Sequence, residues 1–278
     1  MTNSITENID YEIVTNRLKA LIGTARSVRN EMSRVDNPFN YAMTKSADMT
    51  QSFQRVLDMA IGYGIEGGDL YKDKNLLKDI IYSLDYLHDN YYNIREKMPF
   101  SNDNWWDWEI GSAQFLLKIL VIISDELTQE SIDKYLEPFN RYDPLPVMTM
   151  SNRINIAYST IFAGALQHDY KRIAFSVEML RECFDTVEKG DGFYDDGSFI
   201  QHDYYPYIGG YGSSMIIALT TISFSLNKSI FRFDDEMKDY QYNWVINSYL
   251  PFMYNGGFLD LVRGREITRK SNLPQTGK

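Results

Sequence analysis

The chain has very little cysteine and histidine, and each shortage limits the kinds of site it can form. It contains one cysteine and three histidines among 278 residues. A single cysteine excludes a disulfide within the chain and any metal site built from several cysteines. Cys183 stands among Met179, Leu180 and Phe184, which predicts a core position. A phosphate-binding glycine loop, a Gly-x-Ser-x-Gly elbow and a His-Glu-x-x-His zinc motif are also missing.

Long apolar runs are missing as well. No stretch reaches the roughly 18 residues that a membrane-spanning helix needs, so we expect no membrane partner. Residues 1–10 are polar and acidic, without a basic region followed by an apolar core, so no signal peptide is visible. This pattern fits a cytoplasmic chain, or a chain that starts after its signal.

Basic residues are fewer than acidic residues in this chain. The chain has 28 basic and 38 acidic residues, and its formal net charge is -10. A nucleic-acid binder usually presents a basic face, so we expect no nucleic-acid partner. A polyanionic substrate is disfavoured too unless basic residues cluster locally, because a cleft can have a field of its own. Aromatic residues, at 14%, are typical of carbohydrate- or protein-binding surfaces, or pack between helices.

Strand-like alternation is missing before the last part of the chain, while helical periodicity is common. Apolar residues at helical spacing predict helices over residues 11–35, 48–63, 72–94, 107–124, 128–136, 152–167, 170–187, 213–226 and 234–250. Such paired helices indicate an all-α fold of stacked hairpins, either a bundle or an α/α toroid. We find no linker, so residues 1–278 are predicted to form one domain. Residues 262–267 are expected to be extended.

One long segment, residues 192–212, interrupts this helical pattern. It is rich in glycine and aromatic residues and shows no helical periodicity until about Ser213. Long irregular segments in helical chains are often functional. This segment holds His202 and, nine residues later, Tyr211. A histidine titrates near neutral pH and a tyrosine hydroxyl both donates and accepts, so the two residues suit an acid/base pair. The alternative is a hydrogen-bonded structural histidine.

Three of the four tryptophans lie close together in the run Asn104-Trp-Trp-Asp-Trp-Glu-Ile-Gly. Indole faces stack on the C–H faces of sugar rings, and an adjacent asparagine or aspartate can bind hydroxyl groups. Trp105 and Trp106 are neighbours at a loop-helix junction, so they cannot both point into one core. Asp107 also suits a helix N-terminus. The alternative is a tryptophan cluster in the core, and Trp108 is expected to be structural.

Two further groups offer polar donors. Asn152 is the first residue of a predicted helix, a position typical of an N-cap. Arg263, Arg265 and Arg269 follow a Gly-Gly turn at residues 256–257. Guanidinium groups bind carboxylate or sulfate groups in a fork geometry, and these three would supply the local positive field that the whole chain lacks. A solvated basic stretch is the alternative.

Taken in order, these segments resemble polysaccharide lyase family 8, which includes hyaluronate, chondroitin AC and xanthan lyases. The aromatic octet matches Asn-Trp-Trp-x-Trp-Glu-Ile-Gly. Residues 192–212 match Gly-Phe-Tyr-x-Asp-Gly-Ser-Phe-Ile-Gln-His followed by Pro-Tyr-x-Gly-x-Tyr-Gly. Residues 149–153 keep the Asn-Arg of Thr-Gly-Ala-Asn-Arg, with Met-Ser in place of Gly-Ala, and residues 263–269 are similar to Arg-Gly-Arg-x-x-x-Arg. The resemblance covers about residues 104–269.

This resemblance implies an incomplete α/α toroid that needs no metal or organic cofactor. It implies a lyase for a uronic-acid polymer such as hyaluronan or chondroitin, which is a polyanionic polysaccharide. The residues to which it gives roles are, in catalysis, Asn152, His202, Tyr211, Arg263 and Arg269, and, in substrate binding, Asn104, Trp105, Trp106, Arg153 and Arg265. Pairing of Arg265 with Glu266 or Asp260 is also expected.

In the implied reaction, Asn152 and the arginines hold the uronate carboxyl group while a base removes the C5 proton and the C4–O bond breaks. Tyr211 protonates the leaving oxygen, and the base is either His202 or Tyr211. Members of the family are longer, so C-terminal β domains are expected to pack on this chain, and we expect a secreted or cell-surface location. The alternatives are a polysaccharide-binding fragment without activity and a glycoside hydrolase on an α/α toroid.

Overall fold

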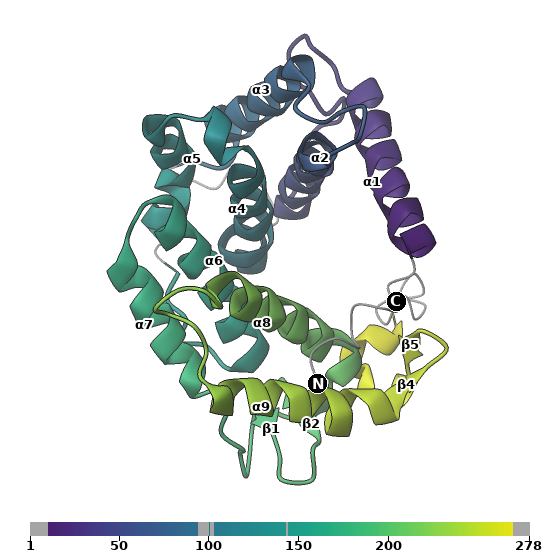
Figure 1. Cartoon of the computed structure of the whole chain (residues 1–278), viewed down its shortest axis with the longest axis vertical. Coiled ribbons are helices and arrows are strands. Elements are labelled where there is room, and N and C mark those ends of the chain that lie inside the picture. The colour runs from purple at the N-terminus through teal and green to yellow at the C-terminus, as the bar shows by residue number, and fades with distance from the viewer. Residues whose placement is uncertain (1–10, 94–99, 101–102, 143, 269–278) are drawn as a thin grey trace. The chain divides into compact units, whose positions relative to one another are not determined.

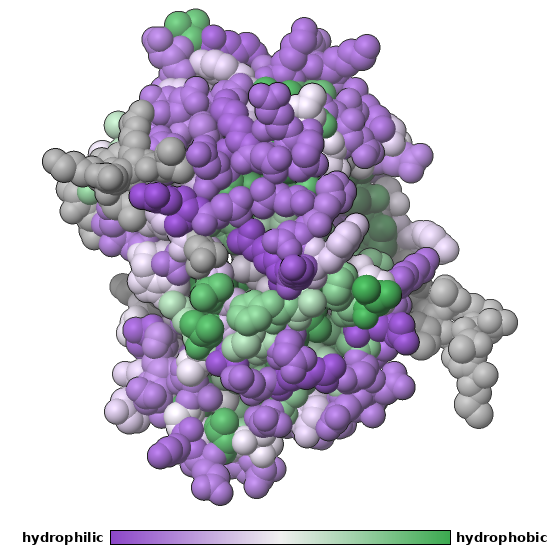
Figure 2. Space-filling view, turned by 90° about the vertical axis from the view of Figure 1, so that its left-hand side faces the viewer, coloured by the Kyte–Doolittle hydropathy of each residue, from purple (hydrophilic) through white to green (hydrophobic). Residues whose placement is uncertain are grey.

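The computed structural model describes residues 11–93, 100, 103–142 and 144–268 (Figure 1). The chain divides into two compact units, Met1–Asp143 and Pro144–Lys278. Within the described ranges, each helix is too short or too polar to cross a lipid bilayer. Figure 2 shows a face on which hydrophilic side chains dominate and hydrophobic ones form a smaller patch.

The N-terminal unit consists of helices around α2. Its long helices are α1 (Tyr11–Glu31), α2 (Ser46–Gly64), α3 (Lys74–Asn90), α4 (Ser112–Ile123) and α5 (Gln129–Tyr142). Helix α2 packs against α1, α3 and α4, and buries Phe53, Val56 and Ala60 at helical spacing. Gly62 permits the close approach of α1, because a β-carbon there would collide with the side chain of Ala25.

In the described part of the C-terminal unit, residues 144–268, the long helices are α6 (Met150–Leu166), α7 (Tyr170–Arg181), α8 (Ser213–Leu226) and α9 (Asp235–Trp244). Helix α6 packs against both α7 and α8. Two small antiparallel sheets accompany them. One has the order β1 (Gly192–Phe193), β2 (Phe199–Gln201), β3 (Tyr205–Pro206), and the other pairs β4 (Met253–Tyr254) with β5 (Gly257–Phe258).

Aromatic stacking attaches the first sheet to α9. Phe193 of β1 stacks on Trp244 at the end of α9, with ring centroids 4.2 Å apart, and Phe184 stacks on Trp244 at 5.2 Å. Cys183 is buried in the same core, as predicted, and burial raises the pKa of its thiol to about 12. The segment between α7 and α8 is therefore anchored by aromatic side chains in the hydrophobic core, although it contains little regular structure.

The predicted helices are confirmed, and several of their bounds are corrected. The fifth was predicted to end before Pro138, yet α5 continues to Tyr142 with this proline inside it. Leu136 and Phe139 are fully buried on one face of α5, so packing outweighs the hydrogen bond that proline cannot make. The extended segment predicted for residues 262–267 is wrong, because 3-10 turns η7 (Asp260–Val262) and η8 (Gly264–Thr268) occupy this part of the chain.

Candidate functional site

The chain turns sharply directly after β2, and this turn carries His202. His202 and Asp203 both have left-handed backbone conformations, with φ of 58° and 65°. Such conformations are costly for residues other than glycine and are concentrated at functional sites. The chain then passes through β3 into η4 (Ile208–Gly212), a π-helical turn that carries Tyr211. Turns of this kind are also frequent at functional sites.

This route brings the predicted acid/base pair together. The rings of His202 and Tyr211 meet edge to face, with centroids 4.9 Å apart and an interplanar angle of 89°. A third ring, Tyr207, lies 4.9 Å from Tyr211 and 6.3 Å from His202. The contact between His202 and Tyr211 agrees with the predicted pair, and their catalytic roles remain predictions.

Arg265 completes the group from the turn η8. Its Nη2 lies 2.6 Å from Nε2 of His202. An arginine can only donate, so Nε2 of His202 accepts and the neutral imidazole carries its proton on Nδ1. Burial and the positive charge of Arg265 lower the pKa of His202, against the opposing carboxylates of Asp191 and Asp203. We call His202, Tyr207, Tyr211 and Arg265 the His202 cluster.

The expected pairing of Arg265 with Glu266 or Asp260 is corrected by these contacts. Arg263 holds Asp260 instead, with 2.8 Å between Nη1 and Oδ1, and its buried side chain packs over Gly209. Gly264 stands between the two arginines with a φ of +52°, and their side chains have different surroundings. Arg269, the other arginine predicted to be catalytic, lies outside the described residues.

The first turn of α6 is fixed to the His202 cluster by Ser151. Its amide donates to Oε1 of Gln201 over 3.3 Å, and its Oγ donates to the carbonyl oxygen of Tyr211 over 3.0 Å. Asn152 is the next residue and is half-buried. The alternative reading of Asn152 as the helix N-cap is wrong, because Thr149 occupies that position and Asn152 is the third residue of α6. Its amide is therefore not required to cap the helix.

Asp191, which no sequence motif singled out, joins the same two segments. Its carboxylate accepts from Oγ1 of Thr149 over 2.6 Å, from the backbone amide of Asp203 over 2.8 Å, and from the side-chain amide of Gln201. One carboxylate therefore holds both the start of α6 and the turn at His202. The only sequence signal for it is its place directly before the glycine-rich segment.

Arg153 has partners within the protein. It donates from Nε to the carbonyl of Met148 and from Nη1 to the carbonyl of Met179, over 2.5 and 3.2 Å, and it also forms an ion pair with Glu182. These bonds fix the segment before α6 to the end of α7. The substrate contact predicted for Arg153 stays a prediction.

Tyr207 is the first tyrosine of the Pro-Tyr-x-Gly-x-Tyr-Gly run, and the resemblance gave it no role. Its side chain is only 1% exposed, and its ring lies between two glycines. A β-carbon at Gly210 would be 2.5 Å from the ring, and one at Gly264 would be 2.7 Å from it. Gly210 in the loop of residues 192–212 and Gly264 in the Arg-Gly-Arg run thus leave room for the ring of Tyr207.

Replacing Gly264 by alanine should therefore destabilise the C-terminal unit strongly. The new methyl group would collide with the ring of Tyr207, and the backbone would keep a left-handed conformation that alanine resists. We expect a loss of about 2–4 kcal/mol in the free energy of unfolding, measured by urea denaturation. Gly190→Ala is the matched control, because Gly190 also has a positive φ, of 80°, but open space around it. Equal losses in the two variants would contradict the proposed collision.

The N-terminal unit presents the predicted aromatic platform, Trp105 and Trp106. Their side chains are 43% and 38% exposed, whereas Trp108 is 2% exposed and stacks on Tyr92 with centroids 5.9 Å apart. This confirms that Trp108 is structural. Trp106 lies over Gly111, where a β-carbon would come within 2.6 Å of its ring. Both exposed indoles remain available to a ligand.

Asp107 holds the segment of the two exposed tryptophans against α2. It is buried, and its carboxylate accepts from Oγ of Ser46 over 2.7 Å and from Oγ1 of Thr50 over 2.8 Å, both in α2. The same Ser46 hydroxyl accepts from the backbone amide of Asn104 over 2.9 Å. Asp107 is thus a buried anchor of the π-helical turn η2 (Asp107–Gly111) rather than a solvent-exposed helix charge. The side chain of Asn104 is exposed and accepts from the amide of Trp106 over 3.2 Å.

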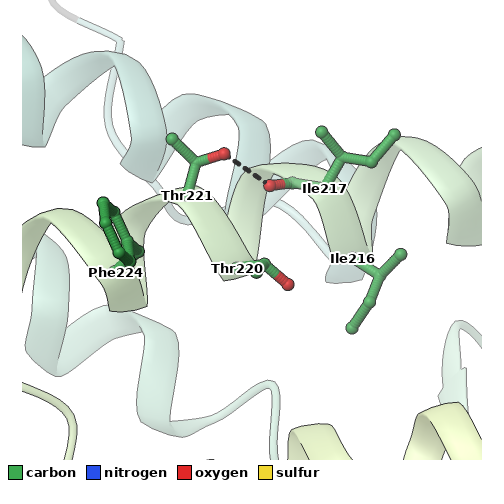
Figure 3. A pocket seen from close by; sticks show the side chains of 5 residues that line it. All are labelled: Ile216, Ile217, Thr220, Thr221 and Phe224. Atoms are coloured by element: carbon green, nitrogen blue, oxygen red, sulfur yellow. Dashed lines mark hydrogen bonds between the residues drawn. The ribbon is translucent and has the colours of Figure 1, made fainter. Parts of the chain in front are cut away.

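A shallow hydrophobic pocket on α8 lacks groups for acid/base chemistry (Figure 3). It is lined by Ile216, Ile217, Thr220, Thr221 and Phe224. The hydroxyl of Thr221 donates to the carbonyl of Ile217 over 2.8 Å. Among the residues that the structure describes, no three His, Cys, Asp or Glu side chains are grouped to hold a metal ion. The His202 cluster is therefore the better candidate for catalysis.

Comparison with known families gives one extensive match. Residues 6–277 match the model of the N-terminal α-helical domain of polysaccharide lyase family 8. Hyaluronate lyase HylB of Enterococcus faecalis is 30% identical over 93% of this chain and 29% of its own length. Xanthan lyase of a Bacillus species is 31% identical over 81% of this chain and 24% of its own length. The chain thus spans less than a third of either relative.

Solved structures show the same fold. A xanthan lyase from Paenibacillus has a TM-score of 0.84 and 33% identity, over 97% of this chain and 26% of its own. The chondroitin AC lyase of Streptomyces coelicolor, solved with chondroitin sulphate, has a TM-score of 0.79 and 28% identity, over 91% of this chain and 35% of its own. These matches confirm the predicted all-α fold class.

Proposed function

The chain belongs to polysaccharide lyase family 8, and we propose that it cleaves a uronic-acid-containing polysaccharide by β-elimination. The observation that carries this proposal is the His202 cluster. An imidazole, two phenols and a guanidinium group meet there, next to the first turn of α6 that bears Asn152. These groups suit the removal of a proton next to a carboxyl group.

The reaction needs two proton transfers and hydrogen-bond donors that stabilise the negative charge of its intermediate. Removal of the C5 proton leaves an electron pair that the neighbouring carboxyl group shares as an enolate-like dianion. The amide of Asn152 and a guanidinium group stabilise this charge by hydrogen bonds. The pair then forms the C4–C5 double bond, the C4–O bond breaks, and the leaving oxygen takes a proton. The products are a new sugar end and an unsaturated uronate.

We assign the base to Tyr211 rather than His202. The Nε2 lone pair of His202 accepts a hydrogen bond from Arg265, and its other ring nitrogen carries the proton. The neutral imidazole thus has no free lone pair while Arg265 stays in place. The ionised oxygen of Tyr211 takes the C5 proton and then gives it to the leaving oxygen, so this residue ends in the state in which it began. His202 supports the Tyr211 ring by its edge-to-face contact.

Relatives guide the choice of substrate. They include hyaluronate lyases and a chondroitin AC lyase solved with chondroitin sulphate, so hyaluronan and chondroitin are our first choices and xanthan the third. Such polymers are polyanions, and exposed Arg265 offers a guanidinium group to a carboxylate. Because the polymers are extracellular, we propose that the protein acts outside the cell or at its surface.

One assay distinguishes the candidate functions. The chain is incubated with hyaluronan, chondroitin sulfate and xanthan in turn, while ultraviolet absorbance, reducing ends and binding are followed. We expect absorbance of the unsaturated product together with new reducing ends. Reducing ends without absorbance would indicate a glycoside hydrolase, and binding without either signal would indicate a binding fragment. Either of these results would overturn the proposal.

Loss of the aromatic platform should weaken substrate binding more than it slows chemistry. We expect the double variant Trp105→Ala, Trp106→Ala to raise KM by about 10–100-fold, with kcat changed less than about threefold. Steady-state kinetics on hyaluronan measures both constants. Phe224→Ala, which removes another exposed aromatic side chain, is the control and should leave KM unchanged. An unchanged KM in the double variant would exclude the tryptophans from binding.

A further inference from the structure

We propose that Asp191 and Gln201 are a positioning pair, which holds three segments of the candidate site at fixed distances from one another. The segments are those that carry the proposed catalytic residues Asn152, His202 and Tyr211, so this role rests on the proposed function. The resemblance gave neither side chain of the pair a role, and neither reacts with substrate in the proposed mechanism. Their hydrogen bonds form one continuous chain that reaches all three segments.

The side-chain amide of Gln201 has only one orientation that satisfies its partners. Gln201 is 1% exposed, so water has almost no access to it, and a lost partner would leave a buried polar group unpaired. Its Nε2 donates to Oδ2 of Asp191, and its Oε1 accepts from the backbone amide of Ser151 over 3.3 Å. A carboxylate only accepts and a backbone amide only donates, so a flipped side chain would lose both bonds. Asp191 therefore fixes the direction in which Gln201 binds the start of α6.

The carboxylate of Asp191 uses both of its oxygens. Oδ2 also accepts from Oγ1 of Thr149 over 2.6 Å, and Oδ1 accepts from the backbone amide of Asp203 over 2.8 Å. Thr149 occupies the N-cap position of α6, and Asp203 follows His202 in the left-handed turn. Left-handed conformations are costly for such residues and persist only where the surroundings hold them, so a charge-assisted bond at this amide stabilises the turn that carries His202.

Ser151 extends this chain of bonds to the third segment. While its amide donates to Gln201, its Oγ donates to the carbonyl oxygen of Tyr211 over 3.0 Å. Asn152 is the next residue of α6, so its backbone moves with that of Ser151. A displacement of about 1 Å at a catalytic group can cost about 100-fold in rate. Loss of the pair should therefore lower kcat much more than it changes KM.

The experiment exchanges the amide and the carboxylate between the two positions. Gln201→Glu alone places two carboxylates against each other, and like charges repel. Asp191→Asn alone leaves a single oxygen to serve donors on two sides, so the amide of Ser151 or that of Asp203 loses its acceptor. In the double variant Asp191→Asn, Gln201→Glu, the new amide donates to the new carboxylate, whose second oxygen still accepts from Ser151. The double variant also keeps the net charge of wild type.

We expect each single variant to lower kcat on hyaluronan by about 30–100-fold with KM within about threefold, and the double variant to return kcat to within about fivefold of wild type. Asp196→Asn is the matched control, because Asp196 is exposed in the same loop and accepts from the amide of Ser198 over 2.9 Å instead. It should leave kcat unchanged. Wild-type kcat in both single variants, or a double variant as slow as the two losses combined, would overturn the proposal.

Amide hydrogen exchange, followed by NMR, gives a second measurement that does not require turnover. In Asp191→Asn the amide of Ser151 or that of Asp203 should exchange at least about tenfold faster, and the double variant should restore its protection. Faster exchange across the whole chain would show general destabilisation and would contradict a positioning role. A wild type without unsaturated product would contradict the proposed function, whereas the exchange of these two amides would still decide whether the pair holds the three segments.

Discussion

Tyr211→Phe should abolish the formation of unsaturated product, with a loss in kcat of about 10³-fold or more. The hydroxyl oxygen is the only atom removed, and the mechanism uses this oxygen twice, to take the C5 proton and to protonate the leaving oxygen. The ring contacts with His202 and Tyr207 remain, as does the bond from Ser151 to the backbone of residue 211. The variant should therefore keep its fold, which circular dichroism can check.

Tyr204→Phe is the matched control for Tyr211→Phe. Both changes remove one phenol oxygen from the same loop, but Tyr204 is exposed and outside the His202 cluster. We expect wild-type rates from the control. If Tyr211→Phe retained more than about a tenth of the wild-type kcat, the phenol would not be the proton donor, and the base would have to be sought at His202.

Asn152→Ala should have the second-largest effect, a loss of about 10²–10³-fold in kcat/KM. The amide of Asn152 is proposed to stabilise negative charge on the carboxyl group, and one such donor is usually worth this amount. The cap of α6 is at Thr149, so stability should change by less than about 1 kcal/mol. The rate is measured on hyaluronan or chondroitin, and the stability by thermal unfolding.

The outcome for Asn152 separates a catalytic from a structural role. Loss of activity with an unchanged unfolding temperature supports the proposal. Loss of activity that follows a large drop in stability would instead indicate that Asn152 helps to hold α6. Asn227→Ala is a suitable control, because Asn227 is an exposed asparagine at the C-terminal end of α8 and lies outside the cluster.

The helices could be predicted well because their evidence is local. Periodic apolar residues and caps, such as Asp234 before α9, lie within each segment. The three-stranded sheet was not predicted, because strands of two or three residues are too short to show alternation. Its formation depends on pairing across turns and on the stacking of Phe193 on Trp244, which joins residues far apart in sequence.

The candidate site, like the fold, could be predicted from the sequence only in part. The glycine-rich loop and the Arg-Gly-Arg run indicated which segments matter, and the contact of His202 with Tyr211 agrees with that prediction. The sequence analysis gave catalysis to Arg263 and Arg269 and binding to Arg265. It could not indicate that Arg265 is the arginine that contacts His202, because the left-handed Gly264 and the partners of each guanidinium are set by the fold. The roles of Asp191 and Tyr207 were missed for the same reason, since Asp191 contacts Thr149 and Tyr207 packs on Gly264, which lie in other segments of the chain.

The use of the tryptophans and the catalytic residues by one substrate stays a prediction. Trp105 and Trp106 belong to the N-terminal unit, and the His202 cluster belongs to the C-terminal unit. The KM effect of the tryptophan variants, measured beside the kcat effect of Tyr211→Phe, tests functionally whether one substrate uses both.

Mass spectrometry of the products tests the central claim most directly. The chain is incubated with a defined hyaluronan oligosaccharide, and the masses of the two fragments are added. Elimination predicts a sum equal to the mass of the intact oligosaccharide, with the double bond in the fragment that carries the cleaved uronate. A sum larger by the mass of one water molecule would show hydrolysis and would contradict the lyase mechanism built on Tyr211, His202 and Asn152.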